Sequence, residues 1–279
     1  MKTLPHFLVI GAMKSGTTTL YRDLESHAGV SLFEKEGSPL LRDTAAREYG
    51  RGFRGEGRLR GDVSTHYTMR PQYENAAARA AGLLGPETKI LYIVRDPVRR
   101  AVSHFLHWST DSRFQVPDSI DEAVLRVAEL TDWGRYATQI TPWVQAFGVS
   151  SVRLIRFEDY VSDRAGEFAA VCRWLGIDER VSVSQEAHNR SAGKPVLGEF
   201  WTKVRDSPAY EHVRRYLPQA LKDQAKRAVM RPAETPAAVP SDAAIAELVS
   251  RLRPEVAKLR DIFGPSAPTW DWAEESIAA

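Results

Sequence analysis

The sequence predicts an α/β fold, a single P-loop-like domain in which a central parallel sheet is flanked by helices. Short apolar runs of strand length alternate with segments of helical periodicity along the chain. The first apolar run, at residues 7–10, leads through a glycine-bounded turn into a helical pattern, as in a parallel β–α–β unit. The 279 residues can bury a full core and show neither an internal repeat nor a clear domain boundary. We therefore expect one domain over residues 1–279.

The elements follow from periodicity and from capping residues. Strands are expected near residues 7–12, 89–94 and 151–157, with a short one near 61–64. Helices are expected near residues 17–28, 72–84, 97–109, 119–130, 134–147 and 164–175. Three prolines exclude a regular helix from residues 231–241, which we expect to form an exposed linker or lid. Ser241 is expected to cap a further helix, and Pro254 to begin the last one.

The stretch Phe7–Leu20, FLVIGAMKSGTTTL, carries the clearest functional signal. Its turn leads into a helix N-terminus, where unpaired backbone N–H groups and the helix dipole favour an anion. Glycines 11 and 16 have the spacing of a Walker A loop, but Thr17 stands in the place of that motif's lysine, and Lys14 precedes the second glycine. The residues expected to bind phosphate are Lys14, Ser15, Gly16, Thr17 and Thr18.

A second anion-binding segment, Lys89–Ser103, reads KILYIVRDPVRRAVS. Arg95 follows a buried strand, and parallel sheets bind ligands at the carboxyl ends of their strands. A guanidinium group can hold a phosphate through two parallel hydrogen bonds. Ser103 lies eight residues later on the following helix. We therefore predict that Arg95 binds a second phosphate.

Both segments resemble motifs of sulfotransferases that use 3′-phosphoadenosine 5′-phosphosulfate (PAPS). K-S-G-T-T resembles the family's 5′-phosphosulfate loop, and the second segment resembles its 3′-phosphate motif, R-x-P-x-x-R-x-x-S. The second resemblance implies that Ser103 binds the 3′-phosphate together with Arg95. Looser similarities cover most of the chain, and they lie at Lys35-Glu36, at Gly61–Tyr67 (GDVSTHY), at Gly134, Tyr136 and Trp143, at Val152–Tyr160 (VRLIRFEDY) and at His188–Lys194 (HNRSAGK). The chain is most similar to bacterial and heparan-sulfate-type carbohydrate sulfotransferases.

The resemblance implies an enzyme that transfers the sulfuryl group of PAPS, its co-substrate, to an acceptor hydroxyl by in-line displacement. Lys14 then stabilises the charge that builds on the departing phosphate, and no metal is expected because lysine and arginine replace magnesium. The late basic loop implies that Arg190, Gly193 and Lys194 contact the nucleotide.

The acceptor side is less well defined by the resemblance. Asp62 matches the family glutamate that acts as general base, but its side chain is one methylene shorter. His66, four residues on, is the competing candidate, and Lys35 is expected to contact the acceptor with them. Sugar hydroxyls, a glycolipid or a phenol on a secondary metabolite all fit as the acceptor, and the oligomeric state is left open.

Two other functions stay open at this point. A P-loop nucleotide or small-molecule kinase would use the same strand, loop and helix, but neither G-K-[ST] nor an acidic strand end for magnesium occurs in the expected form. A relative that only binds nucleotide is the second alternative. The joint presence of Lys14, Arg95 and Ser103 argues against it.

Composition limits the binding partners and the cellular setting that we expect for this protein. The net charge of +2 implies no nucleic-acid-binding stripe, although arginines 51, 54, 58 and 60 cluster among glycines, either as solvated side chains or as the rim of an acidic-substrate site. The single cysteine, Cys172, excludes an internal disulfide and is expected in a helix core. No apolar run reaches membrane-spanning length, and the first strand leaves no room for a removable signal peptide. We therefore expect a cytoplasmic bacterial enzyme.

Overall fold

The computed structural model describes residues 4–53, 57–111, 113–180 and 239–272, together with the backbone of residues 196–197 and 230–231. Arg190, Gly193 and Lys194 lie outside these described residues, as does most of the expected lid at 231–241. The backbone pairs 196–197 and 230–231 form two short antiparallel strands, β6 and β7. None of the described helices is long and apolar enough to span a membrane.

The core of the structure is a five-stranded sheet with the order β2-β3-β1-β4-β5. Its strands are β1 (Phe7–Val9), β2 (Val30–Leu32), β3 (Leu59–Val63), β4 (Lys89–Val94) and β5 (Val152–Arg156). Every neighbouring pair is parallel, which confirms the predicted sheet. All five carboxyl ends therefore lie at one edge, and the loops after β1, β2, β3 and β4 meet there.

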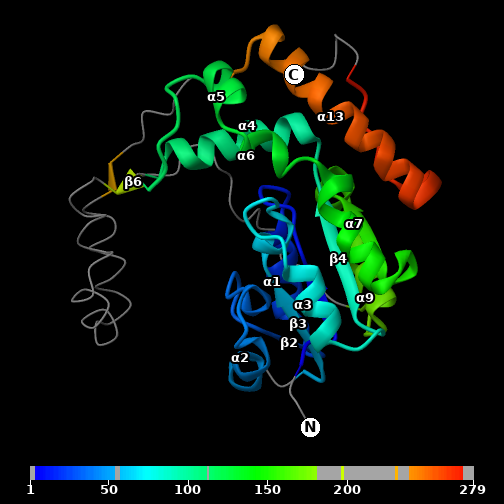
Figure 1. The fold of residues 1–279 in the computed structure, drawn as a ribbon. Coiled ribbons are helices and arrows are strands. Elements are labelled where there is room, and N and C mark those ends of the chain that lie inside the picture. The colour runs from blue at the N-terminus through cyan, green and yellow to red at the C-terminus, as the bar shows by residue number, and fades with distance from the viewer. Residues whose placement is uncertain are drawn as a thin grey trace.

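Helices cover both faces of this sheet (Figure 1). On one face lie α1 (Thr17–Ser26), α8 (Phe157–Ser162) and α9 (Arg164–Leu175), which pack on Phe7, Val9, Leu91 and Ile93. On the other lie α2 (Ala45–Gly52), α3 (Ala76–Leu83) and α7 (Tyr136–Phe147), which pack on Leu8, Ile90, Tyr92 and Val94. The apolar strand residues thus alternate between the two faces, as expected for strands buried on both sides.

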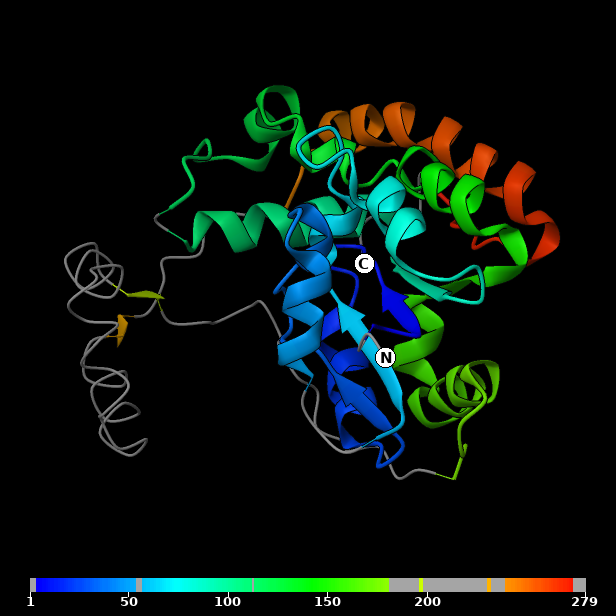
Figure 2. The ribbon, with the colours of Figure 1, turned by 60° about the horizontal axis from the view of Figure 1, so that its bottom comes forward.

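A separate helical cluster lies over the carboxyl edge of the sheet (Figure 1). It consists of α4 (Pro97–Ser109), α5 (Ile120–Arg126), α6 (Glu129–Asp132) and α13 (Asp242–Phe263), which share an apolar core. Figure 2 shows that α13 also runs beside α7, so this helix joins the cluster to one face of the sheet. Short 3-10 turns connect the elements, at Pro39–Leu41, Thr65–Thr68, Val149–Ser151 and Gly264–Ser266.

The predicted elements differ from the structure mainly where segments are short. Helix α4 has the predicted bounds and begins after Asp96, whose side chain accepts a hydrogen bond from the Arg99 N–H. The short β2, α2 and α8 were not predicted, because three to eight residues give little periodicity. The helix expected at 119–130 is divided into α5 and α6.

The end of the chain corrects one prediction. Ser241 does cap α13, since its hydroxyl accepts a hydrogen bond from the Ala244 N–H, but Pro254 lies inside this helix and does not start a new one. Residues on both sides of the proline are buried, including Leu252 before it and Leu259 after it. This continuous packing offsets the hydrogen bond that a proline inside a helix removes.

Candidate active site

The loop between β1 and α1 has the geometry of an anion site. Gly16, the N-cap residue of α1, has a positive φ of 92° and no side chain that could accept hydrogen bonds from the first-turn N–H groups of the helix. A Cβ at Gly16 would lie 2.6 Å from the ring of Phe157, which explains the need for glycine. Lys14 is half-buried in the loop, and Ser15 and Thr17 are buried. The structure therefore brings the predicted loop residues together at the N-terminus of α1.

Arg95 lies beside this loop, at the end of the neighbouring strand β4. Its Nη1 donates a hydrogen bond of 3.5 Å to the carbonyl oxygen of Lys14, and its guanidinium group lies 4.9 Å from the ring centre of Phe157. Burial lowers the pKa of the Arg95 guanidinium. Its buried Nε has no hydrogen-bond partner among the described residues. A phosphate would fit this position, because it would supply the acceptor that the buried Nε lacks.

Phe157 is a site residue that the sequence did not indicate. It begins α8, directly after β5, and its ring touches both Gly16 and Arg95. The available signal was its position at the carboxyl end of a strand, where the ligand-binding edge lies.

The other two polar residues of the second motif lie farther along α4. Arg100 is fully buried, donates a hydrogen bond to the Leu130 carbonyl, and lies 3.4 Å from His104 Nδ1. It therefore ties α4 to α6. Ser103 is half-buried on the same helix.

A second polar group surrounds Glu36, in the loop after β2. The Glu36 Oε2 atom accepts hydrogen bonds from the Thr65 N–H (2.8 Å) and from the hydroxyls of Ser64 and Thr65 (3.2 Å each). The other oxygen, Oε1, lies 2.9 Å from Lys35 Nζ. The Glu36 side chain keeps 29% of its surface exposed, so this carboxylate is held in place and still reachable.

His66 belongs to the same polar group. Its Nδ1 lies 3.6 Å from Glu36 Oε2 and 2.8 Å from the hydroxyl of Ser38. The hydroxyls of Ser38 and Ser64 are 2.6 Å apart. The structure thus brings the predicted residues Lys35 and His66 together around Glu36, a residue to which the sequence assigned no chemical role.

Asp62 occupies a different environment, and its burial argues against the predicted role as base. This side chain is fully buried within β3, and its Oδ2 accepts hydrogen bonds from the hydroxyls of Tyr49 (2.6 Å) and Tyr67 (2.5 Å). Burial raises the pKa of Asp62 to about 6. Asp62 has no exposed surface through which an acceptor could reach it, and its Oδ1 has no hydrogen-bond partner among the described residues, so its role as base stays a prediction.

An aromatic group lies beside the phosphate loop. Met69, Trp108 and Trp133 pack together and contact Met13, the residue before Lys14. The ring of Phe114 stacks on Trp108 with a centroid distance of 4.6 Å and is 37% exposed. This stack gives the segment after α4 a partly exposed apolar surface.

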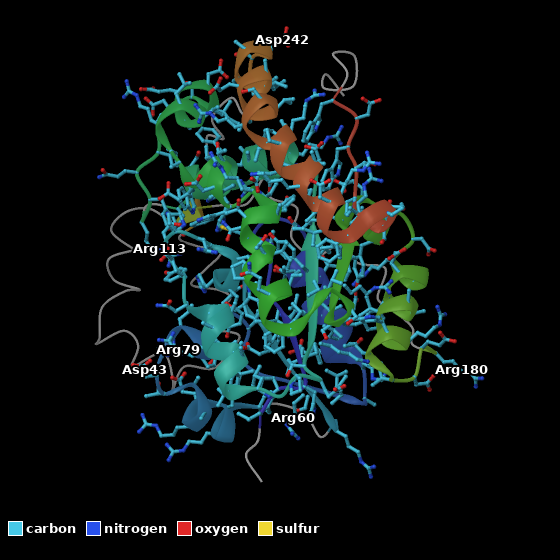
Figure 3. The ribbon with its side chains drawn as sticks, turned by 45° about the vertical axis from the view of Figure 1, so that its right-hand side comes forward. Asp43, Arg60, Arg79, Arg113, Arg180 and Asp242 are labelled. Atoms are coloured by element: carbon cyan, nitrogen blue, oxygen red, sulfur yellow. The ribbon has the colours of Figure 1, made fainter. Side chains whose placement is uncertain are left out.

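Arg60, one arginine of the arginine and glycine cluster, lies far from the proposed ligand edge. Arg60, near the start of β3, donates a hydrogen bond of 2.8 Å to the Leu4 carbonyl and contacts the ring of His6. Figure 3 shows Arg60 at the end of the molecule opposite Asp242, the first residue of α13. Arg60 therefore lies at the amino edge of the sheet, away from Lys14 and Arg95, and Arg54 is outside the described residues.

Comparison with known proteins agrees with this geometry. The model of the sulfotransferase domain family matches residues 4–196. The chain belongs to this family. Its match to mouse heparan sulfate glucosamine 3-O-sulfotransferase 3B1 is 29% identical over 213 residues and covers 70% of this chain and 52% of the relative. A match to the bifunctional heparan sulfate N-deacetylase/N-sulfotransferase 1 of Caenorhabditis elegans is 26% identical and covers 77% of this chain and 28% of that protein.

A solved structure supports the fold. The crystal structure of a sulfotransferase from Alicyclobacillus acidocaldarius has a TM-score of 0.65 and 20% identity to this chain, and the match covers 93% of this chain and 96% of that one. The chain spans about half the length of the mouse 3B1 relative, so the fold and the family are established without fixing a substrate.

Proposed function

We propose that this protein transfers the sulfuryl group of PAPS to a hydroxyl of a carbohydrate, glycolipid or secondary-metabolite acceptor by in-line displacement. The observation that carries the proposal is the contact between two strand ends. Arg95 donates to the Lys14 carbonyl, so two cationic residues on adjacent strands face one ligand edge. Family membership disfavours a P-loop kinase. The joint presence of Lys14, Arg95 and Ser103 disfavours a relative that only binds nucleotide.

On the donor side, the loop residues 14–18 bind the 5′-phosphosulfate and Arg95, with Ser103, binds the 3′-phosphate. Lys14 stabilises the negative charge that develops on the bridging oxygen as the sulfur–oxygen bond breaks. Lysine and arginine supply the charge that magnesium supplies in kinases, so the step needs no metal. Contacts from Arg190, Gly193 and Lys194 are predictions that rest on the family resemblance.

On the acceptor side, we assign the general base to Glu36. Its carboxylate takes the proton of the acceptor hydroxyl as the new oxygen–sulfur bond forms. The Thr65 N–H and the Ser64 hydroxyl fix one carboxylate oxygen, while the Lys35 ammonium group neutralises the other. His66 lies next to this base, with its Nδ1 3.6 Å from Glu36 Oε2. Glu36 replaces Asp62 because only Glu36 combines a fixed carboxylate with exposed surface.

The acceptor class is narrowed by two observations. The curated relatives are named for heparan sulfate, which favours a carbohydrate. The exposed Phe114 ring on Trp108 offers a flat apolar surface, against which the apolar face of a sugar or another ring can pack. A cytoplasmic location and a bacterial source stay predictions from the sequence.

The test is a transfer assay with PAPS labelled in its sulfuryl group. Candidate acceptors include sulfated and unsulfated oligosaccharides, glycolipids and phenols, and labelled ATP serves as the control donor. The proposal predicts label in at least one hydroxyl acceptor, with release of adenosine 3′,5′-bisphosphate. Phosphoryl transfer from ATP, with none from PAPS, would instead support the kinase alternative.

A further inference from the structure

The C-terminal segment after α13 lies against the carboxyl ends of β4 and β5. Trp270 Nε1 donates a hydrogen bond of 3.3 Å to Glu158 Oε2, and Trp272 Nε1 donates one of 2.9 Å to Asp96 Oδ2. These partners are 112 and 176 residues away in the sequence. Both indole rings are half-buried, so they are packed against the structure as well as hydrogen-bonded. We call residues 270–272 the tryptophan tail.

The two carboxylates that the tail contacts also hold the turn between β4 and α4. Glu158 Oε1 accepts a hydrogen bond of 2.8 Å from the Asp96 N–H, and Asp96 Oδ1 accepts one of 2.8 Å from the Arg99 N–H. Each carboxylate thus joins an indole N–H to a backbone N–H of the same turn. Asp96 is 9% exposed, so water cannot readily replace a lost partner.

Arg95 is the residue that this turn presents to the ligand edge. Its backbone is held from the other side by Tyr136, whose hydroxyl donates a hydrogen bond of 2.7 Å to the Arg95 carbonyl oxygen. The ring of Tyr136 in turn lies 6.1 Å from the ring of Trp270. The tail therefore contacts two residues that adjoin Arg95. Trp270 lies beside Tyr136, which is hydrogen-bonded to the Arg95 backbone, and Trp272 is hydrogen-bonded to Asp96, the next residue in the sequence.

We propose that the tryptophan tail is a positioning element that sets the direction of the Arg95 guanidinium toward the 3′-phosphate of the donor. This inference rests on the proposed function, which assigns that phosphate to Arg95. A guanidinium that binds phosphate through two hydrogen bonds depends on orientation, and a small rotation of its backbone loses one of them. The tail consequently affects selectivity for a 3′-phosphorylated nucleotide and does not itself touch the reacting atoms.

The test compares Trp272→Phe in the full chain with the wild type. Phenylalanine retains an aromatic ring but removes the N–H donor to Asp96. We expect the Kd for adenosine 3′,5′-bisphosphate to rise about tenfold, as for the loss of one hydrogen bond to a charged group, while the Kd for AMP changes less than about twofold. Titration calorimetry gives both constants, and Trp270→Phe should shift the same ratio by a smaller factor.

Trp174→Phe is the matched control, since the Trp174 ring packs over the Lys89 ammonium group at the opposite end of β4. It should leave the ratio of the two Kd values unchanged.

Two results for Trp272→Phe would overturn the inference. One is an equal loss of affinity for both nucleotides, which would show a general structural role, and the other is a pair of Kd values that do not differ from those of the wild type. If the wild type itself does not prefer the bisphosphate, the assignment of Arg95 fails and the inference fails with it. Should Trp272→Phe not fold, equal bisphosphate preference in Trp270→Phe and wild type would overturn the inference.

Discussion

The donor region and the acceptor region of this protein are assembled differently. The donor loop is local, because residues 11–16 connect β1 directly to α1 and carry their own lysine and glycines. The acceptor region is not local, because Glu36 follows β2 while Ser64 and His66 follow β3. A local sequence pattern can therefore identify the donor site, whereas the base depends on which loops the sheet order places side by side.

Two carboxylates make this difference concrete. Asp62 fits a family pattern but is covered by Tyr49 and Tyr67, whereas Glu36 is fixed by hydrogen bonds and remains partly exposed. Access to the acceptor hydroxyl, and not the type of residue, separates a candidate base from a buried structural acid.

Glu36→Gln is the substitution with the largest expected effect. It preserves the shape of the side chain and removes its basicity, so kcat should fall by about 10²–10⁴-fold. Binding of adenosine 3′,5′-bisphosphate should hardly change, since Glu36 lies on the acceptor side. Steady-state kinetics and calorimetry give the two quantities.

Asp62→Asn is the matched control for that experiment, because it makes the same carboxylate-to-amide change in the core. Its turnover should stay near that of the wild type. An inactive Asp62→Asn enzyme beside a fully active Glu36→Gln enzyme would reverse the assignment and restore Asp62 as the base.

Lys14→Ala tests the donor region at the point of bond breaking. The lysine interaction strengthens as charge develops on the leaving group, so its loss should lower kcat by about 10²–10³-fold, with some loss of donor affinity. Rapid-quench measurement of a single turnover isolates this step. A variant that keeps kcat and changes only the KM for PAPS would contradict the leaving-group role.

Arg95→Ala should act on binding more than on turnover. In the proposed assignment the guanidinium contacts a phosphate remote from the transferred group, so its removal should weaken binding of adenosine 3′,5′-bisphosphate by about 1.5–3 kcal/mol. Thermal shifts measured with the bisphosphate and with AMP should become similar in the variant and differ in the wild type. Arg60→Ala, at the opposite edge of the sheet, is the control and should leave both shifts unchanged.

The smallest effect on activity is expected from Asp62→Asn, whose effect is on stability. The folded-state pKa of Asp62 is raised to about 6, above its ordinary value of 3.8, so the folded state binds the proton more tightly than the unfolded state does. This contribution to stability is fully present below the unfolded pKa and is lost as the pH rises toward and through about 6.

The asparagine variant lacks this titration. The free energy of unfolding of the variant, minus that of the wild type, should therefore increase between pH 4 and pH 7 by up to about 3 kcal/mol, because only the wild type loses stability over this range. Urea unfolding at several pH values measures the change. A difference between the two proteins that stays constant with pH would mean that Asp62 ionises as freely in the folded protein as in the unfolded chain.

The sequence by itself determined the local parts of this protein. The order of strand, loop and helix, the phosphate-loop residues, Arg95 at a strand end and the bounds of α4 all depend on residues close together in the chain. The parallel sheet followed from the alternation of strands and helices, because parallel strands need such connections.

Only the tertiary structure decided the rest. The order β2-β3-β1-β4-β5 brings the loop of Glu36 against Ser64, and the packing under α2 buries Asp62. Tertiary packing also decided the contact of Trp272 with Asp96, 176 residues apart in the sequence, and the continuation of helix α13 past Pro254. Burial and hydrogen bonding between distant segments arise from the packed fold as a whole, so no short pattern records them, and they decide which carboxylate stays exposed.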